Sequence, residues 1–205
     1  MLSLCRAYVI AQTPAQNRSL VSLAERAGFG FVGTVLGERR VTIEAERGEI
    51  VYFLVHHKLS DGTMSSIIRL LRDNDDDAIR YAPILLIIGD CPFETILKYV
   101  RFGYDDIIAL PEKRESIVAR LQNQLNNEQF YVETDDYLGP DRRRMELGAA
   151  SDRRRADSPH ARLTIQRTVE HGVRVLRRLY AGQRPRMAAV PMPVARAVVE
   201  ARSHA

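Results

Sequence analysis

Two adjacent histidines, His56 and His57, are the residue types in this 205-residue chain that most directly invite chemistry. An imidazole can bind a metal ion or act as a general base near neutral pH. The pair follows an apolar run over residues 49–55, which predicts a buried strand, and neighbouring strand residues point to opposite faces. We therefore expect the two rings to diverge and to form hydrogen bonds, with no metal site and no catalytic residue. A pH-sensing role is the alternative.

The nearby carboxylates also have ordinary structural interpretations. Asp61 precedes Gly62, a typical turn pair, and Asp90 stands where it would cap a helix that starts at Pro92. The acidic run over residues 73–77 lacks the ligand spacing of a calcium loop. We expect no metal and no cofactor.

A segment rich in arginine offers different chemistry. It contains two short repeats, residues 141–146 (DRRRME) and 152–157 (DRRRAD), each with three arginines between acidic residues. Guanidinium groups bind carboxylates, phosphates and guanine edges in a bidentate manner. Three interpretations remain open: a charge-mixed linker, a segment that orders on binding a partner, and a site for a cyclic dinucleotide or DNA. The candidate binding residues are Arg143, Arg144, Arg154, Arg155 and Asp157.

The charge of the chain divides at about residue 140. Residues 1–140 contain 15 Lys and Arg against 20 Asp and Glu, a net charge of −5. Residues 141–205 contain 15 Arg against 6 acidic residues, a net charge of +9. This asymmetry predicts a globular domain followed by a basic extension.

Strand and helix patterns alternate through the first 126 residues, as a parallel α/β sheet requires. Apolar runs predict strands over residues 5–11, 29–35, 49–55, 83–88 and 106–109, and helices are expected over 14–27, 38–47, 64–72, 92–102 and 112–125. Five strands in alternation with five helices predict a flavodoxin-like, doubly wound, five-stranded parallel sheet.

The loop from His56 to Met64 (HHKLSDGTM) resembles the D-x-x-L-P-D-G-S-G loop of bacterial response-regulator receiver domains. Two further segments, residues 102–106 (FGYDD) and 109–111 (ALP), are similar to the family's G-A-D-D-Y and Lys-Pro elements. The resemblance covers about residues 3–126 and implies the receiver fold.

The family's working residues are replaced in this chain. The resemblance aligns Ala11 and Gln12 with the acidic pair that holds Mg²⁺, and His56 with the phosphorylated Asp. Gly89 stands where the family has a hydroxyl residue, and Leu110 where it has the phosphate-pairing Lys. The resemblance therefore implies a degenerate pseudo-receiver that is not phosphorylated at this site.

A receiver without phosphorylation is expected to act as a signalling adaptor through protein–protein interaction, and not as an enzyme. Phe102 and Tyr104 are the expected contact aromatics. The expected partner is a signalling protein such as a histidine kinase or another regulator. A cyclic-dinucleotide- or DNA-binding regulator that acts through the arginine-rich segment is the alternative function.

We expect a C-terminal amphipathic helix over residues 159–182, with Ser158 as its cap and Gly182 at its end. Its apolar stripe, at 3.6-residue spacing, consists of Ile165, Val169, Val173, Leu176, Leu179 and Tyr180. A lone helix cannot bury such a stripe, so it must pack on protein, for example in a homodimer, in preference to a membrane.

The expected organisation is a receiver-like domain (1–127), an arginine-rich linker (128–158), the amphipathic helix (159–182) and a flexible tail (183–205). No apolar run reaches the roughly 18 residues of a membrane span, and the two cysteines lack metal-site spacing. A cytoplasmic location is expected.

Overall fold

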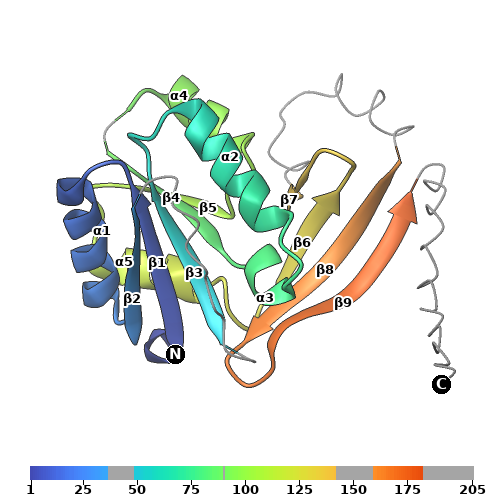
Figure 1. Cartoon of the computed structure of the whole chain (residues 1–205). Helices are drawn as coiled ribbons and strands as arrows, with labels where there is room; N and C mark the ends of the chain where they lie inside the picture. The colour runs from blue at the N-terminus through green and yellow to red at the C-terminus, as the bar shows by residue number, and fades with distance from the viewer. Residues whose placement is uncertain (37–48, 90, 142–158, 182–205) are drawn as a thin grey trace, which may run out of the picture.

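Five parallel strands form the first sheet of the computed structural model, which describes residues 1–36, 49–89, 91–141 and 159–181. Side by side they lie in the order β2 (Phe31–Leu36), β1 (Cys5–Ala11), β3 (Ile50–His56), β4 (Ile84–Ile88) and β5 (Asp106–Ala109) (Figure 1). This 2-1-3-4-5 order is that of flavodoxin-like folds. The predicted doubly wound parallel sheet is confirmed.

Helices cover both faces of this sheet, after a short 3-10 turn at Leu2–Leu4. They are α1 (Pro14–Ala27), α2 (Asp61–Arg72), α3 (Asp77–Arg80), α4 (Phe93–Val100) and α5 (Arg114–Gln122). Side chains of α1 and α5 belong to the buried cluster on one face, and those of α2, α3 and α4 to the cluster on the other. The helix expected over residues 38–47 lies outside the described residues.

Local side-chain chemistry explains where the helices begin and end. Thr13 and Gln16 form a capping box at the start of α1, and Gly28 ends this helix with φ at 93°. The Ser60 hydroxyl accepts the Thr63 N–H, so α2 begins at Asp61 and not at Met64 as expected.

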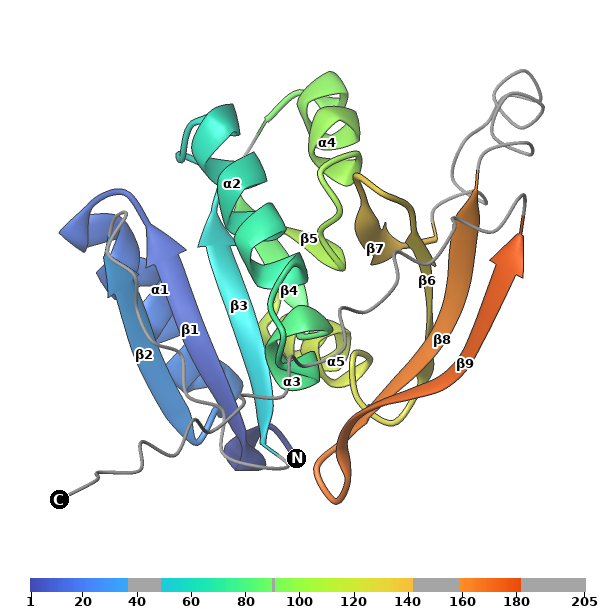
Figure 2. The same cartoon turned by 45° about the vertical axis from the view of Figure 1, so that its right-hand side comes forward.

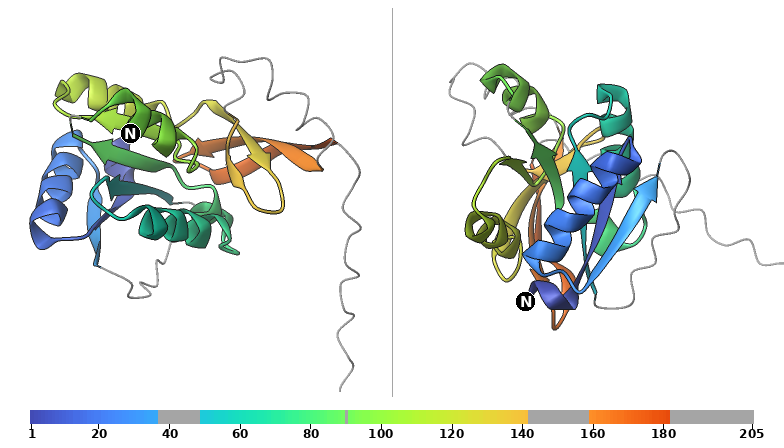
Figure 3. Two further views of the ribbon diagram at one scale, coloured as in Figure 1. Left: turned by 90° about the horizontal axis from the view of Figure 1, so that it is seen from above. Right: turned by 90° about the vertical axis from the view of Figure 1, so that its left-hand side faces the viewer.

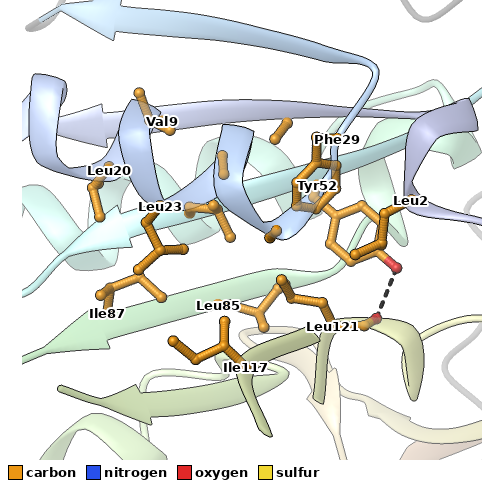
Figure 4. Close-up of a cluster of buried hydrophobic side chains, with 14 of the residues drawn as sticks. Leu2, Val9, Leu20, Leu23, Phe29, Tyr52, Leu85, Ile87, Ile117 and Leu121 are labelled. Atoms are coloured by element: carbon orange, nitrogen blue, oxygen red, sulfur yellow. Dashed lines mark hydrogen bonds between the residues drawn. The ribbon is translucent and has the colours of Figure 1, made fainter. Parts of the chain in front are cut away.

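The core between α1, α5 and the sheet is apolar and includes the buried hydroxyl group of Tyr52 (Figure 4). Tyr52 of β3 is fully buried, and its hydroxyl donates to the Leu121 carbonyl oxygen at 3.0 Å. This hydrogen bond joins the central strand to α5, because a buried hydroxyl without a partner would be costly.

The C-terminal part of the described chain forms a second sheet, not a helix. Its four antiparallel strands lie in the order β7 (Leu138–Pro140), β6 (Glu128–Glu133), β8 (His160–Thr168) and β9 (Gly172–Ala181) (Figure 2). Seen from above, it extends beyond the β5 side of the first sheet (Figure 3). The expected amphipathic helix over 159–182 is wrong, and the homodimer through that helix loses its basis.

The physical reason is a period of two that competes with the period of 3.6. Ala161, Leu163, Ile165 and Arg167 alternate along β8 and are all buried, which is the pattern of a strand. Gly172 adopts φ of 70° next to the turn, where it allows the chain to reverse into β9. Strands β6 and β7 lie inside the segment expected as a linker, while residues 142–158 and 182–205 lie outside the described residues.

A buried ion cluster joins the two sheets. Asp105, just before β5, accepts hydrogen bonds from Arg72 of α2 at 2.7 Å and from Arg167 of β8 at 3.0 Å. The three side chains are at most 3% exposed. Tyr131 of β6 donates its hydroxyl hydrogen to Asp105, and the Ile84 N–H donates to the same carboxylate at 2.7 Å. The cluster therefore contains residues of both sheets.

The two guanidinium groups also satisfy backbone carbonyls. Arg167 donates to the carbonyl oxygen of Tyr81 at 2.8 Å and to the side-chain oxygen of Gln124 at 3.1 Å. Arg72 donates to the carbonyl oxygens of Arg80 and Ala82 at 2.8 and 2.9 Å. A buried charge needs such partners, since its desolvation is expensive.

The two guanidinium groups, with the hydrogen bonds from Tyr131 and Ile84, outweigh the effect of burial and hold the pKa of Asp105 below its ordinary value. The carboxylate is therefore ionised at neutral pH, and the cluster has two positive charges around one negative charge.

Replacement of Asp105 should cost more stability than replacement of Arg167. Asp105→Asn leaves two buried guanidinium groups without a counterion, and we expect a loss of about 3–5 kcal/mol in the free energy of unfolding. Arg167→Met leaves the Arg72–Asp105 pair in place, so its loss should be smaller, about 1–3 kcal/mol. Urea denaturation followed by circular dichroism measures both.

The double variant Asp105→Asn/Arg167→Met should lose less stability than the sum of the two single losses. Without Asp105 the buried charge of Arg167 is destabilising, so its removal then costs less. Arg177→Met, on the exposed part of β9, is the matched control and should change stability by less than about 0.5 kcal/mol. Strictly additive losses, or a control as damaging as Arg167→Met, would contradict this account of the cluster.

The same cluster predicts a dependence on pH. Since the pKa of Asp105 is lower in the folded chain, its contribution is complete above the unfolded-state pKa of about 3.9 and is lost as pH falls below it. The stability difference between wild type and Asp105→Asn should thus be constant from pH 7 to 5 and shrink toward pH 3. Urea titrations at each pH test this, and a difference that grows on acidification would have the wrong sign.

Candidate functional site

The carboxyl ends of the parallel strands form the candidate site, because ligands of doubly wound sheets bind where the strand order reverses. Here the order reverses between β1 and β3. Ala11 ends β1 and is buried, and Gln12 follows it with an exposed side chain. His56 ends β3, Gly89 follows β4, and Leu110 follows β5. The structure therefore brings the ends that carry all five positions to one edge of the sheet.

Two imidazoles occupy the centre of this edge. The rings of His56 and His57 stack, with centroids 4.9 Å apart and an interplanar angle of 19°. The expected divergence is wrong, because β3 ends at His56 and His57 already belongs to the following turn, where strand alternation no longer applies. The end of β3 at His56 therefore determines that the two rings stack.

The hydrogen bonds of the pair define two different tautomers. His56 Nδ1 accepts the Lys58 N–H at 3.1 Å, so a neutral His56 has its proton on Nε2. His57 Nδ1 donates to the Ile87 carbonyl oxygen at 3.3 Å, which leaves its Nε2 as an acceptor. The edge thus presents one donor and one acceptor.

Both imidazoles are held in the neutral form. Partial burial lowers the pKa of His56, and the neighbouring His57 and Lys58 lower it further. Burial is also the largest cause of the lowered pKa of His57, with the Ile87 hydrogen bond acting in the opposite direction. At pH 7 this edge therefore contributes no positive charge from the imidazoles.

The carboxylates near the edge serve other purposes. Asp61 begins α2 and forms an ion pair with Lys98 of α4, both about half exposed. Asp90 lies outside the described residues. Across the described ranges, no group of three or more His, Cys, Asp or Glu side chains is arranged to hold a metal ion. Of the two imidazoles, His57 is the one whose Nε2 keeps a free lone pair, because His56 Nδ1 accepts from Lys58 and its Nε2 bears the proton.

The space at Gly89 is open to a side chain. A Cβ atom there would meet only the ring of His57, at an ordinary contact distance of 3.7 Å. Packing against the described residues therefore does not exclude a Cβ atom at this position.

Tyr104 cannot be a surface contact. Its side chain is fully buried in the cluster beneath α2, α3 and α4, so the expected role as a partner-facing aromatic is wrong. Phe102 is partly buried and packs on Tyr99, with ring centroids 6.2 Å apart. Its role in partner binding remains a prediction.

The arginine-rich candidates Arg143, Arg144, Arg154, Arg155 and Asp157 lie outside the described residues. The buried cluster of Asp105, Arg72, Arg167 and Tyr131 was not expected from the sequence. The one available signal was the regular position of Arg167 after Ala161, Leu163 and Ile165.

Comparisons with known proteins give fold-level similarity only. No family profile and no curated protein matches the sequence. Solved structures with similar backbones include a putative pilus assembly-related protein from Burkholderia pseudomallei (15% identity, 60% of this chain, 90% of that chain, TM-score 0.43). A second is the chemotaxis response regulator CheY4 of Vibrio cholerae (12% identity, 58% of this chain, 98% of that chain, TM-score 0.43). A third is the signal receiver domain of a histidine kinase from Syntrophus aciditrophicus (20% identity, 60% of this chain, 93% of that chain, TM-score 0.43).

At these identities and TM-scores the similarities assign no function, and the fold assignment comes from the strand order itself. In the described part of the chain, no helix is both long and apolar enough to cross a membrane.

The histidine pair predicts a measurable titration. Lys58→Gln removes a positive charge that lowers both imidazole pKa values, so both should rise toward the ordinary value of 6.5. Nuclear magnetic resonance of the ring Cε1 protons measures each midpoint. Arg174→Gln, on the second sheet, is the control and should leave both midpoints in place. A fall in either midpoint with Lys58→Gln would contradict the assigned geometry.

Proposed function

We propose that this chain is an atypical, receiver-like protein that transmits a signal by binding proteins, without phosphorylation at the carboxyl edge of its sheet. The observation that supports this most is His56 at the end of β3, with its Nδ1 occupied by the Lys58 N–H. An imidazole has no carboxylate oxygen with which to form an acyl phosphate.

The residues around His56 support the same proposal. Mg²⁺ prefers hard oxygen ligands, and the end of β1 has the methyl group of Ala11 and the neutral amide of Gln12. Transfer of a phosphoryl group needs cations or a metal ion to stabilise the developing charge. Leu110, which follows β5, provides no cation. These replacements remove several requirements of the chemistry together.

A sheet edge without this chemistry leaves recognition as the mode of action. The proposed role is therefore that of a non-catalytic adaptor whose partner is another signalling protein, such as a histidine kinase or a second regulator. Its output would depend on the concentration and state of the partner, because the chain itself would not change its charge.

A second function rests on the sequence alone. The two arginine repeats favour binding of a cyclic dinucleotide or DNA. These residues lie outside the described part of the chain. This alternative stays a prediction and uses a different part of the molecule.

Acetyl phosphate with Mg²⁺ tests the adaptor proposal. We expect no label on the wild type and none on His56→Asp, since Ala11, Gln12 and Leu110 still provide neither metal ligands nor a cation. Intact-mass spectrometry detects the added phosphoryl group. A receiver domain with an intact Asp acceptor is the positive control. Label on the wild type or on His56→Asp would overturn the proposal.

A further inference from the structure

The outer edge of β9 is a long strand edge with no partner strand among the described residues. β9 is ten residues long and is the last strand of its sheet, paired on one side with β8 (Figure 2). The strand at the opposite edge, β7, has three residues. Among the described residues, no strand pairs with the free side of β9.

A free strand edge presents a row of backbone N–H and C=O groups that can pair with another extended chain. Proteins commonly protect such edges by making them short or by placing charges and bulges on them. β9 is long, and its one register shift leaves Leu176 as an extra residue opposite Thr164 and Ile165, with regular pairing over residues 172–175 and 177–181 on either side of it. The edge is therefore long enough to receive a complete strand.

The register with β8 divides the side chains of β9 between two faces: Arg174, Arg177 and Leu179 lie on one face, and Val175, Arg178 and Tyr180 lie on the other. Arg174 and Arg177 are exposed, and neither forms an ion pair with another described residue. Between and after them, four apolar side chains remain in water although they belong to a strand: Val175 (37% exposed), Leu176 (45%), Leu179 (45%) and Tyr180 (55%). Charges alone would only protect the edge, whereas interleaved apolar side chains gain from being covered.

The positive charge of this strand has little local compensation. Arg178 pairs with Glu133 of β6 at 2.9 Å, and Glu133 is shared with Arg80 at 2.8 Å. Arg162 on the neighbouring strand β8 is exposed as well. A ligand that covers this edge must therefore bring negative charge.

We propose that β9 accepts an extended segment of a partner protein, rich in acidic and branched apolar residues, as a fifth strand of the second sheet. Backbone hydrogen bonds along the edge would provide affinity, and alternate acidic and apolar side chains would provide selectivity. The acidic side chains pair with Arg174 and Arg177 on one face of the strand, and the apolar ones cover Val175 and Tyr180 on the other.

A second copy of this chain fits the edge less well. Pairing of β9 with β9 of another molecule would bring two sets of the same arginines to one junction, and like charges on adjacent strands are destabilising. A nucleic acid would satisfy the arginines, but its phosphates would leave the aliphatic side chains uncovered. The acidic peptide is the ligand that complements both kinds of side chain.

The β9 edge is a docking site for the partner of the proposed adaptor, so this inference rests on the proposed function. It is physically separate from the carboxyl edge of the parallel sheet. Peptide binding to β9 and phosphoryl transfer to His56→Asp are measured independently, so the failure of one proposal is distinguishable from failure of the other.

The test uses the full chain and a ten-residue peptide of alternating glutamate and valine as the probe. We expect saturable binding by fluorescence anisotropy, weaker at high salt because the charges are exposed. The variant Arg174→Glu/Arg177→Glu should bind at least about tenfold more weakly. Arg18→Glu, on the exposed face of α1, is the matched control and should bind like the wild type.

Two further readouts separate strand addition from simple charge attraction. The same peptide with every backbone amide methylated keeps its charges but loses its hydrogen-bond donors, and it should not bind. Hydrogen exchange of the wild type should slow along β9 when the unmodified peptide is added, since its outward amides become hydrogen-bonded.

Equal binding of the methylated peptide, or equal loss with Arg18→Glu, would overturn the proposal. So would exchange protection that maps outside β9. Absence of peptide binding combined with sedimentation as a dimer that Arg174→Glu/Arg177→Glu dissociates would assign the edge to a second copy. A 20-nucleotide single strand that binds in place of the peptide would assign it to nucleic acid, and both results reject the acidic peptide.

Discussion

The packing of the two sheets depends on one buried carboxylate, which requires positively charged partners. Asp105 stands at the junction of the two sheets, and its charge is compensated by Arg72 of α2 and by Arg167 of β8. Neither guanidinium group would be tolerated in the interior without this carboxylate and the carbonyl oxygens around it. The position of the second sheet follows from this electrostatic requirement together with the small apolar cluster around Tyr81, Tyr131 and Leu163.

The parallel sheet could be predicted because its signals are local and continuous. Residues 83–88 (PILLII) read as a strand buried on both faces, and Gly28 marks the end of α1. The second sheet could not be predicted as easily, because β8 and β9 show a helical stripe and a strand alternation at once. The cluster itself depends on residues 62 positions apart, Asp105 and Arg167, which no local pattern relates. Short-range periodicity is insufficient where a long-range charge pair decides the structure.

At the carboxyl edge, the residue types were readable from the sequence and their geometry was not. Alternation would separate two adjacent side chains, but the end of β3 lies between His56 and His57 and lets the rings stack. The pair shows how a strand boundary shifted by one residue changes the chemistry of a site. It also shows why burial must be known before a charge is assigned, since the lowered pKa of each ring comes first from desolvation.

The contribution of Arg167 to the interior has a consequence for how this protein can be rearranged. Its side chain is fully buried and donates to Tyr81, Gln124 and Asp105, all of which precede the second half of the second sheet. A segment that contains the parallel sheet and ends with α5 is therefore not a complete structural unit. A fusion or domain exchange that preserves its interior has to extend through β8, so the smallest portable unit is set by a single late arginine and not by the visible boundary of the first sheet.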